Sequence, residues 1–166
     1  MNKQEAKTVV SVLMNNVIEE KTKKPFVVNL SANVSIPKHE LLKEVATENN
    51  MAVVRFRSEQ LDEIGMNLEN SLPKEINERM VSNQKELQAS LGENWKNKIS
   101  GVVLFFEEME RVKEPTAEAN YITLFREHAI GNYTLPTKWM MIGSTSFNKL
   151  SMELALPMIH FKIKVD

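Results

Sequence analysis

Residues Gly101 to Val112 read GVVLFFEEMERV, and this stretch decides the fold. Its first six residues form the most apolar run in the chain, and the two carboxylates of Glu107 and Glu108 follow at once. Valine and phenylalanine favour β-structure, and a strand without polar alternation is typical of one that is covered on both faces. We therefore predict a buried strand at 101–106 with two acidic side chains at its carboxyl end.

Four other short runs have the same apolar or β-rich character, and helical patterns separate them. The predicted strands are 26–30 (FVVNL), 51–56 (MAVVRF), 101–106, 139–143 (WMMIG) and 160–165 (HFKIKV). The predicted helices are 3–21, 37–50, 73–91, 115–128 and a short one at 150–156, and residues 61–72 are expected to be irregular. Pro37 is expected at the first position of its helix, and Gly92 is expected to end the third. The pattern predicts an α/β fold with a five-stranded parallel sheet in three αβα layers.

Length and composition limit the organisation of the chain. Its 166 residues suffice for one compact domain, and 42% hydrophobic with 26% charged residues is ordinary globular composition. This composition excludes a disordered tail and a collagen-like fibre. We expect a single domain over 1–166, with an N-terminal helix in 1–24, a core in 25–166 and no helical lid domain after the core.

Charge and cysteine content exclude further classes of protein. Lys and Arg total 21 against 22 Asp and Glu, a net charge of −1, which argues against a dedicated duplex-DNA binder. The absence of cysteine excludes disulfides, thiolate zinc sites and cysteine nucleophiles. No signal-peptide pattern and no apolar run of about 20 residues is present, so we expect a cytoplasmic protein without a membrane partner.

The loops at the carboxyl ends of the predicted strands are where a parallel sheet binds ligands. The loop after the first strand, 32–39, reads ANVSIPKH and matches the spacing of the phosphate loop Gly-x-x-x-x-Gly-Lys-Ser/Thr. Lys38 keeps the place of the motif lysine. Ala32 and Pro37 stand where the motif has glycine, and His39 stands where it has a hydroxyl that ligates magnesium.

These segments, in this order, resemble the αβ core of an AAA+ ATPase, closest to the MoxR-type branch, over about residues 25–165. The stretch 101–112 resembles the Walker B segment, and 51–65 (MAVVRFRSEQLDEIG) resembles the second strand and its loop. The stretch 119–144 resembles the helix, small hairpin and Trp-led strand that end in the polar sensor 1 region, which Ser144, Thr145 or Ser146 matches.

The resemblance implies a P-loop NTPase-like fold and a set of candidate site residues. Glu108 matches the catalytic glutamate, and Glu107 stands where the magnesium-site aspartate is expected. Lys38, His39 and Ser144 occupy the nucleotide-binding positions. ATP and Mg²⁺ are the ligands that such a pocket takes when it functions.

Four departures from the family pattern concern chemistry rather than fold. Ala32 resists the backbone conformation of the first loop glycine, and Pro37 removes an N–H donor. The imidazole of His39 is a poor ligand for magnesium, a hard cation that prefers oxygen. The segment 155–161 (ALPMIHF) contains no arginine where the family places its arginine finger.

The leading hypothesis is a catalytically inactive AAA+-like domain, a pseudo-ATPase that acts as a protein-interaction or regulatory module and needs no cofactor. Its expected partners are other protein subunits, either an active AAA+ protein or further copies of itself. We expect Lys38 to form an ion pair with Glu107 or Glu108 in the nucleotide pocket; the alternative is a solvated lysine in the first turn of a helix. So short and altered a core would also fit a phage or mobile-element gene.

Two alternatives come from other functional classes. The first is a divergent ATP-binding protein or ATPase that uses Lys38, Glu107 and Glu108 with an unusual phosphate loop. The second is a nucleic-acid-associated accessory factor, which only the analogy of fold supports.

Overall fold

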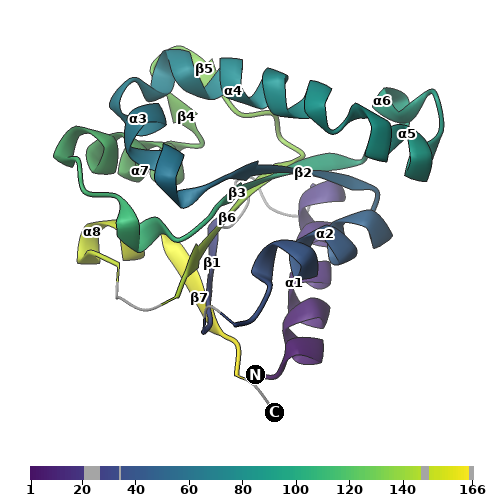
Figure 1. Ribbon diagram of the computed structural model, residues 1–166, viewed down its shortest axis with the longest axis horizontal. Helices are drawn as coiled ribbons and strands as arrows, with labels where there is room; N and C mark the ends of the chain where they lie inside the picture. The colour runs from purple at the N-terminus through teal and green to yellow at the C-terminus, as the bar shows by residue number, and fades with distance from the viewer. Residues whose placement is uncertain (21–26, 34, 147–149, 165–166) are drawn as a thin grey trace.

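The chain forms one central parallel sheet with helices on both of its faces (Figure 1). The computed structural model describes residues 1–20, 27–33, 35–146 and 150–164. The strands of this sheet are β1 (Val27–Ser31), β2 (Met51–Phe56), β3 (Gly101–Phe106), β6 (Trp139–Thr145) and β7 (Met158–Lys162). They lie in the order β2-β3-β6-β1-β7, and every pair is parallel. This arrangement confirms the predicted five-stranded parallel sheet.

The helices cover the sheet in two layers. The α-helices are α1 (Lys3–Ile18), α2 (Lys38–Glu48), α3 (Leu61–Met66), α4 (Leu68–Ser82), α5 (Gln84–Leu91), α6 (Trp95–Lys98), α7 (Pro115–Glu127) and α8 (Met152–Ala155). Helices α1 and α2 bury their apolar sides on one face, and α3, α4 and α7 bury theirs on the other. The three-layer αβα prediction is therefore confirmed.

Short elements complete the chain between these layers. They are the 3₁₀-helices η1 (Ser58–Gln60) and η2 (Met109–Arg111) and the antiparallel pair β4 (Ala129–Ile130) and β5 (Tyr133–Thr134). The pair β4–β5 is the small hairpin that the family resemblance implies. None of the helices within the described ranges is long and apolar enough to cross a membrane.

The two faces of β3 explain its apolar sequence. Val103 and Phe105 pack into the core under α1 and α2, whereas Leu104 and Phe106 pack into the core under α3, α4 and α7. All six residues of β3 are buried. The strand pairs with β2 on one side and β6 on the other, so Glu107 and Glu108 emerge at the carboxyl edge of the sheet.

The structure differs most from the predicted elements between residues 61 and 91. Residues 61–72, expected to be irregular, form α3 and the start of α4. Pro73, expected near the start of a helix, lies inside α4, and Asn83 separates α4 from α5. Apolar side chains at intervals of three and four residues are buried along these helices: Leu61, Ile64, Leu68, Leu72 and Ile76. Their burial outweighs the cost of about 3 kcal/mol for a proline within a helix.

Other differences are confined to the ends of elements. Pro37 precedes α2 as its N-cap residue instead of taking the first helical position. Helix α1 ends at Ile18, β6 continues to Thr145, and β7 covers 158–162 instead of 160–165. The predicted ends at residues 21, 26 and 165 lie outside the described residues. The single-turn helix α6 was not predicted.

We expect Tyr121→Phe to destabilise the fold by about 0.5–1.5 kcal/mol, because it removes a buried hydrogen bond. The hydroxyl of Tyr121 on α7 donates to the backbone oxygen of Leu61 at 2.6 Å and ties α7 to the start of α3. Burial raises the pKa of this phenol, so it stays protonated as a donor. Thermal unfolding measures the loss. The matched control is Tyr133→Phe at a half-buried tyrosine, and equal losses in both variants would contradict the prediction.

Candidate functional site

The five site residues predicted from the sequence come together at the carboxyl edge of the sheet. They line one cavity of about 170 Å³ between the first turn of α2 and the ends of β3 and β6. These residues are Lys38, His39, Glu107, Glu108 and Ser144. The structure thus brings all of the predicted candidates into one place, and their chemical roles depend on how each is held.

The loop before α2 directs its backbone donors toward its own chain. The N–H of Ala32 donates to the carbonyl of Thr145 at 3.1 Å. Asn33 accepts two further bonds, from the N–H of Ser35 at its side-chain oxygen (3.2 Å) and from the N–H of Ile36 at its carbonyl (3.0 Å). Pro37 has no N–H. A phosphate loop binds its ligand through backbone N–H groups that point inward, and these positions do not supply them.

Lys38 is buried, with 7% of its surface exposed, and its ammonium contacts a serine hydroxyl. Its Nζ donates to Oγ of Ser146 at 2.9 Å, and this Oγ donates to Oε1 of Glu108 at 3.0 Å. The predicted direct ion pair of Lys38 with Glu107 or Glu108 is therefore wrong, because Ser146 lies between the charges. Burial lowers the pKa of Lys38, and the carboxylates of Glu108, Glu110 and Glu107 oppose that shift.

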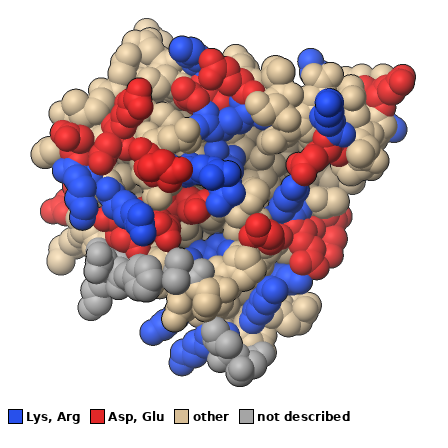
Figure 2. All heavy atoms as spheres, in the orientation of Figure 1, with Lys and Arg blue, Asp and Glu red and all other residues tan. Residues whose placement is uncertain are grey.

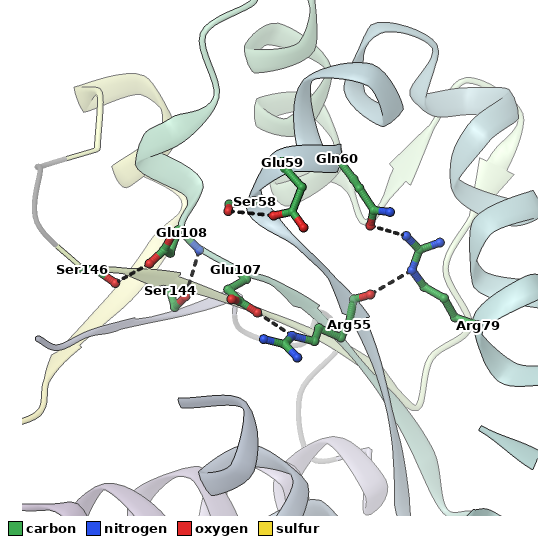
Figure 3. Close-up of polar contacts among 9 residues, drawn as sticks. All are labelled: Arg55, Ser58, Glu59, Gln60, Arg79, Glu107, Glu108, Ser144 and Ser146. Carbon is green, nitrogen blue, oxygen red and sulfur yellow. Dashed lines mark hydrogen bonds and ion pairs between the residues drawn. The ribbon is translucent and has the colours of Figure 1, made fainter. Parts of the chain in front are cut away.

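Glu108 holds a strained backbone conformation at the end of β3. Its φ of 53° lies in the left-handed region, which costs a residue with a side chain about 1–2 kcal/mol. Three contacts fix it, as Figure 3 shows in part: its N–H donates to Oγ of Ser144 at 2.9 Å, its Oε1 accepts from Ser146, and its Oε2 pairs with Nε of Arg111 at 3.0 Å. The carboxylate is thereby held inside the cavity.

Glu107 pairs with an arginine from the neighbouring strand. Nε of Arg55 on β2 donates to Oε2 of Glu107 at 2.5 Å (Figure 3). This pair raises the pKa of Arg55, and the largest cause is its hydrogen bond to Glu107. The carboxylate of Glu107 is thus engaged by a cation of the same chain.

His39 lies flat against the side of this site. Its ring stacks on Phe105 with 6.2 Å between centroids and 4° between planes. Burial lowers the pKa of His39, and the charge of Arg55 lowers it further. The imidazole is therefore held in its neutral form. Across the described ranges, no three His, Asp or Glu side chains gather as a metal-ligand set.

Arg55 and Arg111 were not predicted as site residues, and Ser146 was predicted only as one of three residues in a polar region. The register of β2 on β3 gives a signal for Arg55. Arg55 pairs with Phe105, and Glu107 follows Phe105 by two residues, the spacing that places side chains on the same face. Arg111 lies three residues after Glu108, a spacing that brings side chains together in a helical turn. The role of Ser146 depends on where the end of β6 meets Lys38, and no local pattern encodes that meeting.

Comparisons with known proteins identify the fold. No family model and no curated protein matches this chain. Among solved structures, the RuvB P216G mutant of Thermotoga maritima matches with a TM-score of 0.53 and 14% identity. The ORC1 protein of Aeropyrum pernix, solved in complex with DNA, matches with a TM-score of 0.54 and 9% identity. Each match covers 99% of this chain and 46% of the other.

The likeness to both structures shows that this chain has their fold, a P-loop NTPase-like fold with a five-stranded parallel sheet between two layers of helices. The chain spans a little under half the length of each structure. At these identities the likeness concerns the fold alone.

We expect His39→Phe to reduce the acid sensitivity of the fold. In the unfolded chain His39 takes up a proton as the pH falls through its ordinary pKa of 6.5, whereas the folded chain resists protonation to lower pH. The unfolded state then binds more protons, so this histidine lowers stability below about pH 6.5. Phenylalanine keeps the stack on Phe105 and removes the titration.

Thermal unfolding at about pH 7.5 and about pH 5.5 measures this effect. When the pH is lowered between these two values, the unfolding temperature of the variant should fall by less than that of the wild type. Equal losses in the two proteins would show that His39 carries no proton linkage.

Proposed function

We propose that this chain is a catalytically inactive AAA+-like domain that acts by contact with other proteins. The observation that carries the proposal is the chain of contacts from Lys38 through Ser146 to Glu108. The lysine that would meet a phosphate and the carboxylate that would activate water are joined to one another across the pocket.

The size and lining of the cavity support this proposal. Its volume of about 170 Å³ is below the roughly 300–1,000 Å³ of ordinary ligand pockets. Pro37 gives no N–H to a phosphate, and the N–H groups of Ser35 and Ile36 are bonded to Asn33. Glu107 is paired with Arg55, and His39 offers a stacked imidazole in place of a hydroxyl. The described residues do not fit ATP with Mg²⁺, and we derive no catalytic step through either.

Further parts of the proposal come from the resemblance in sequence. They are the MoxR-type branch and the altered phosphate loop. The expected partners are other protein subunits, either an active AAA+ protein or copies of this chain. A net charge of −1 argues against a nucleic-acid partner.

We expect ATP with Mg²⁺ to leave the thermal unfolding of the chain unchanged. A ligand at a hundred times its dissociation constant stabilises a protein by about 2.7 kcal/mol, or roughly 5–10 °C for a domain of this size. Lys38→Ala is the matched control. A rise of that order in the wild type that is lost in Lys38→Ala would overturn the proposal, as would magnesium-dependent ATP hydrolysis that Glu108→Gln abolishes.

Rebuilding the loop tests the physical reason for inactivity. We expect the combined change Ala32→Gly, Pro37→Gly and His39→Thr to produce an ATP-dependent rise in unfolding temperature that the wild type lacks. The glycines restore backbone freedom and one N–H donor, and the threonine supplies the hydroxyl that binds magnesium. The same triple change with Lys38→Ala is the control. A rebuilt loop that still ignores ATP would show that the loop is not the cause.

One observation favours the alternative of a divergent ATPase. Glu108 is a non-glycine residue held at positive φ by three contacts, and such strain clusters at active sites. Lys38, Glu108 and Ser144 also line one cavity. Under this alternative, nucleotide would displace Ser146 from Lys38, and the ATP experiments above decide between the two functions.

A further inference from the structure

A second and larger cavity lies along the outer edge of the sheet. Its volume is about 820 Å³, and it runs beside β2 between α2 and the helices α4 and α5. In Figure 1 β2 lies between these helices, and it is the outermost strand on this side of the sheet. Figure 2 shows Lys and Arg side chains over this part of the molecule, with Asp and Glu side chains beside them. We call it the β2-edge groove.

The lining of the β2-edge groove is mainly cationic. Lys43, Arg55, Arg57 and Arg79 line it against one carboxylate, that of Glu86. Two of the arginines have partners from their own chain. Arg79 donates to the carbonyl of Arg55 at 2.8 Å and to Gln60 at 2.7 Å and pairs with Glu75, and Arg55 pairs with Glu107.

Among the cations that line the groove, Arg57 is the one without an ion pair in the described part of the chain. Its side chain is exposed, and no ion pair or hydrogen bond of its guanidinium occurs within the described part of the chain. A guanidinium presents a planar fork of donors that suits a carboxylate. Arg57 therefore marks the position where the groove would hold an anionic group from another molecule.

The backbone of β2 adds donors to the same groove. In a parallel strand the N–H and C=O of one residue point to the same side, and successive residues alternate between the two sides. The carbonyl of Phe56 accepts a bond from the N–H of Glu107, so Phe56 directs its backbone groups toward β3. Val53 and Arg55 therefore face outward. Their carbonyls accept bonds from Asn83 (3.1 Å) and Arg79 (2.8 Å), whereas their N–H groups have no partner among the described residues. Two donors spaced two residues apart match the oxygens of an extended chain.

An ion pair shows that a carboxylate already reaches into the groove. Nζ of Lys43 on α2 contacts Oε1 of Glu86 on α5 at 2.6 Å and so crosses it. The two side chains are 46% and 61% exposed, and an exposed pair of this kind contributes about 0–1 kcal/mol. Helix α5 has no fully buried residue. A carboxylate from another molecule would therefore have only a weak contact of Glu86 to displace.

We propose that the β2-edge groove binds an extended acidic peptide segment of a partner protein. One carboxylate of the peptide takes the place of Glu86 at Lys43, and another pairs with Arg57, while the N–H groups of Val53 and Arg55 bind its backbone oxygens. The lining has no Phe, Tyr or Trp on which bases could stack, which favours a peptide over single-stranded nucleic acid. The inference rests on the proposed function only in taking the partner to be a protein.

The test uses the full chain and a fluorescein-labelled ten-residue peptide in which Glu and Val alternate, with binding followed by fluorescence anisotropy. We expect binding that Arg57→Glu weakens about tenfold or more and that Glu86→Gln strengthens, because the first change repels the peptide and the second frees Lys43. Arg126→Glu is the matched control, since Arg126 is exposed and lies outside both cavities. Circular dichroism and unfolding temperature establish that each variant is folded.

Three results would overturn the inference. The first is that the peptide does not bind. The second is that Arg57→Glu and Arg126→Glu weaken its binding equally. The third is that an oligothymidylate of the same charge binds as well as the peptide and is weakened equally by Arg57→Glu. A peptide in which Gln replaces every Glu should not bind, and equal binding of this peptide would remove the role of the carboxylates. The ATP experiments test a different site. Failure of the peptide to bind would therefore not contradict the proposed function, and binding of ATP would not contradict a peptide site in the β2-edge groove.

Discussion

The burial of β3 on both of its faces is the constraint on which the rest of the structure depends. A strand that packs Phe105 under α2 and Phe106 under α7 must lie in the interior of a sheet and needs a partner on each side. Parallel pairing with β2 and β6 satisfies that need and brings the carboxyl ends of these strands to one edge. The paired carboxylates that follow β3 are thereby placed beside Arg55, Ser144 and the first turn of α2.

Charge pairing at that edge follows from this placement. Two adjacent carboxylates at the end of a buried strand are costly unless other groups neutralise them. The chain meets the requirement with Arg55 for Glu107 and with Arg111 and Ser146 for Glu108. The two side chains have separate cationic partners, one on β2 and one three residues further along the chain. The charged side chains at this edge thus pair with groups of their own chain.

The elements that were predicted correctly from the sequence are those that a local pattern of residues determines. The strands 51–56 and 101–106 were predicted with the bounds that the structure has, because their apolar runs end at clear polar boundaries. The helices at 61–72 were missed because Gly65 and Pro73 weaken the helical signal, although tertiary burial of Leu68 and Leu72 decides the outcome. At Gly65 an added Cβ would lie 2.6 Å from the Cβ of Ala117, so this glycine permits the close approach of α3 to α7. The bond from Lys38 to Ser146 joins residues 108 positions apart and has no local signal.

The two cavities are connected through shared residues. Arg55 and His39 line both of them. The guanidinium of Arg55 pairs with Glu107 in the small pocket, while the N–H of the same residue faces the β2-edge groove. A carboxylate in the groove that attracted Arg55 would weaken its pair with Glu107 and leave that side chain to find another cation. Lys38, whose pKa already responds to the charge of Glu107, is a nearby candidate. Through Arg55, a charge bound in the β2-edge groove would act on the internal pairing of the pocket.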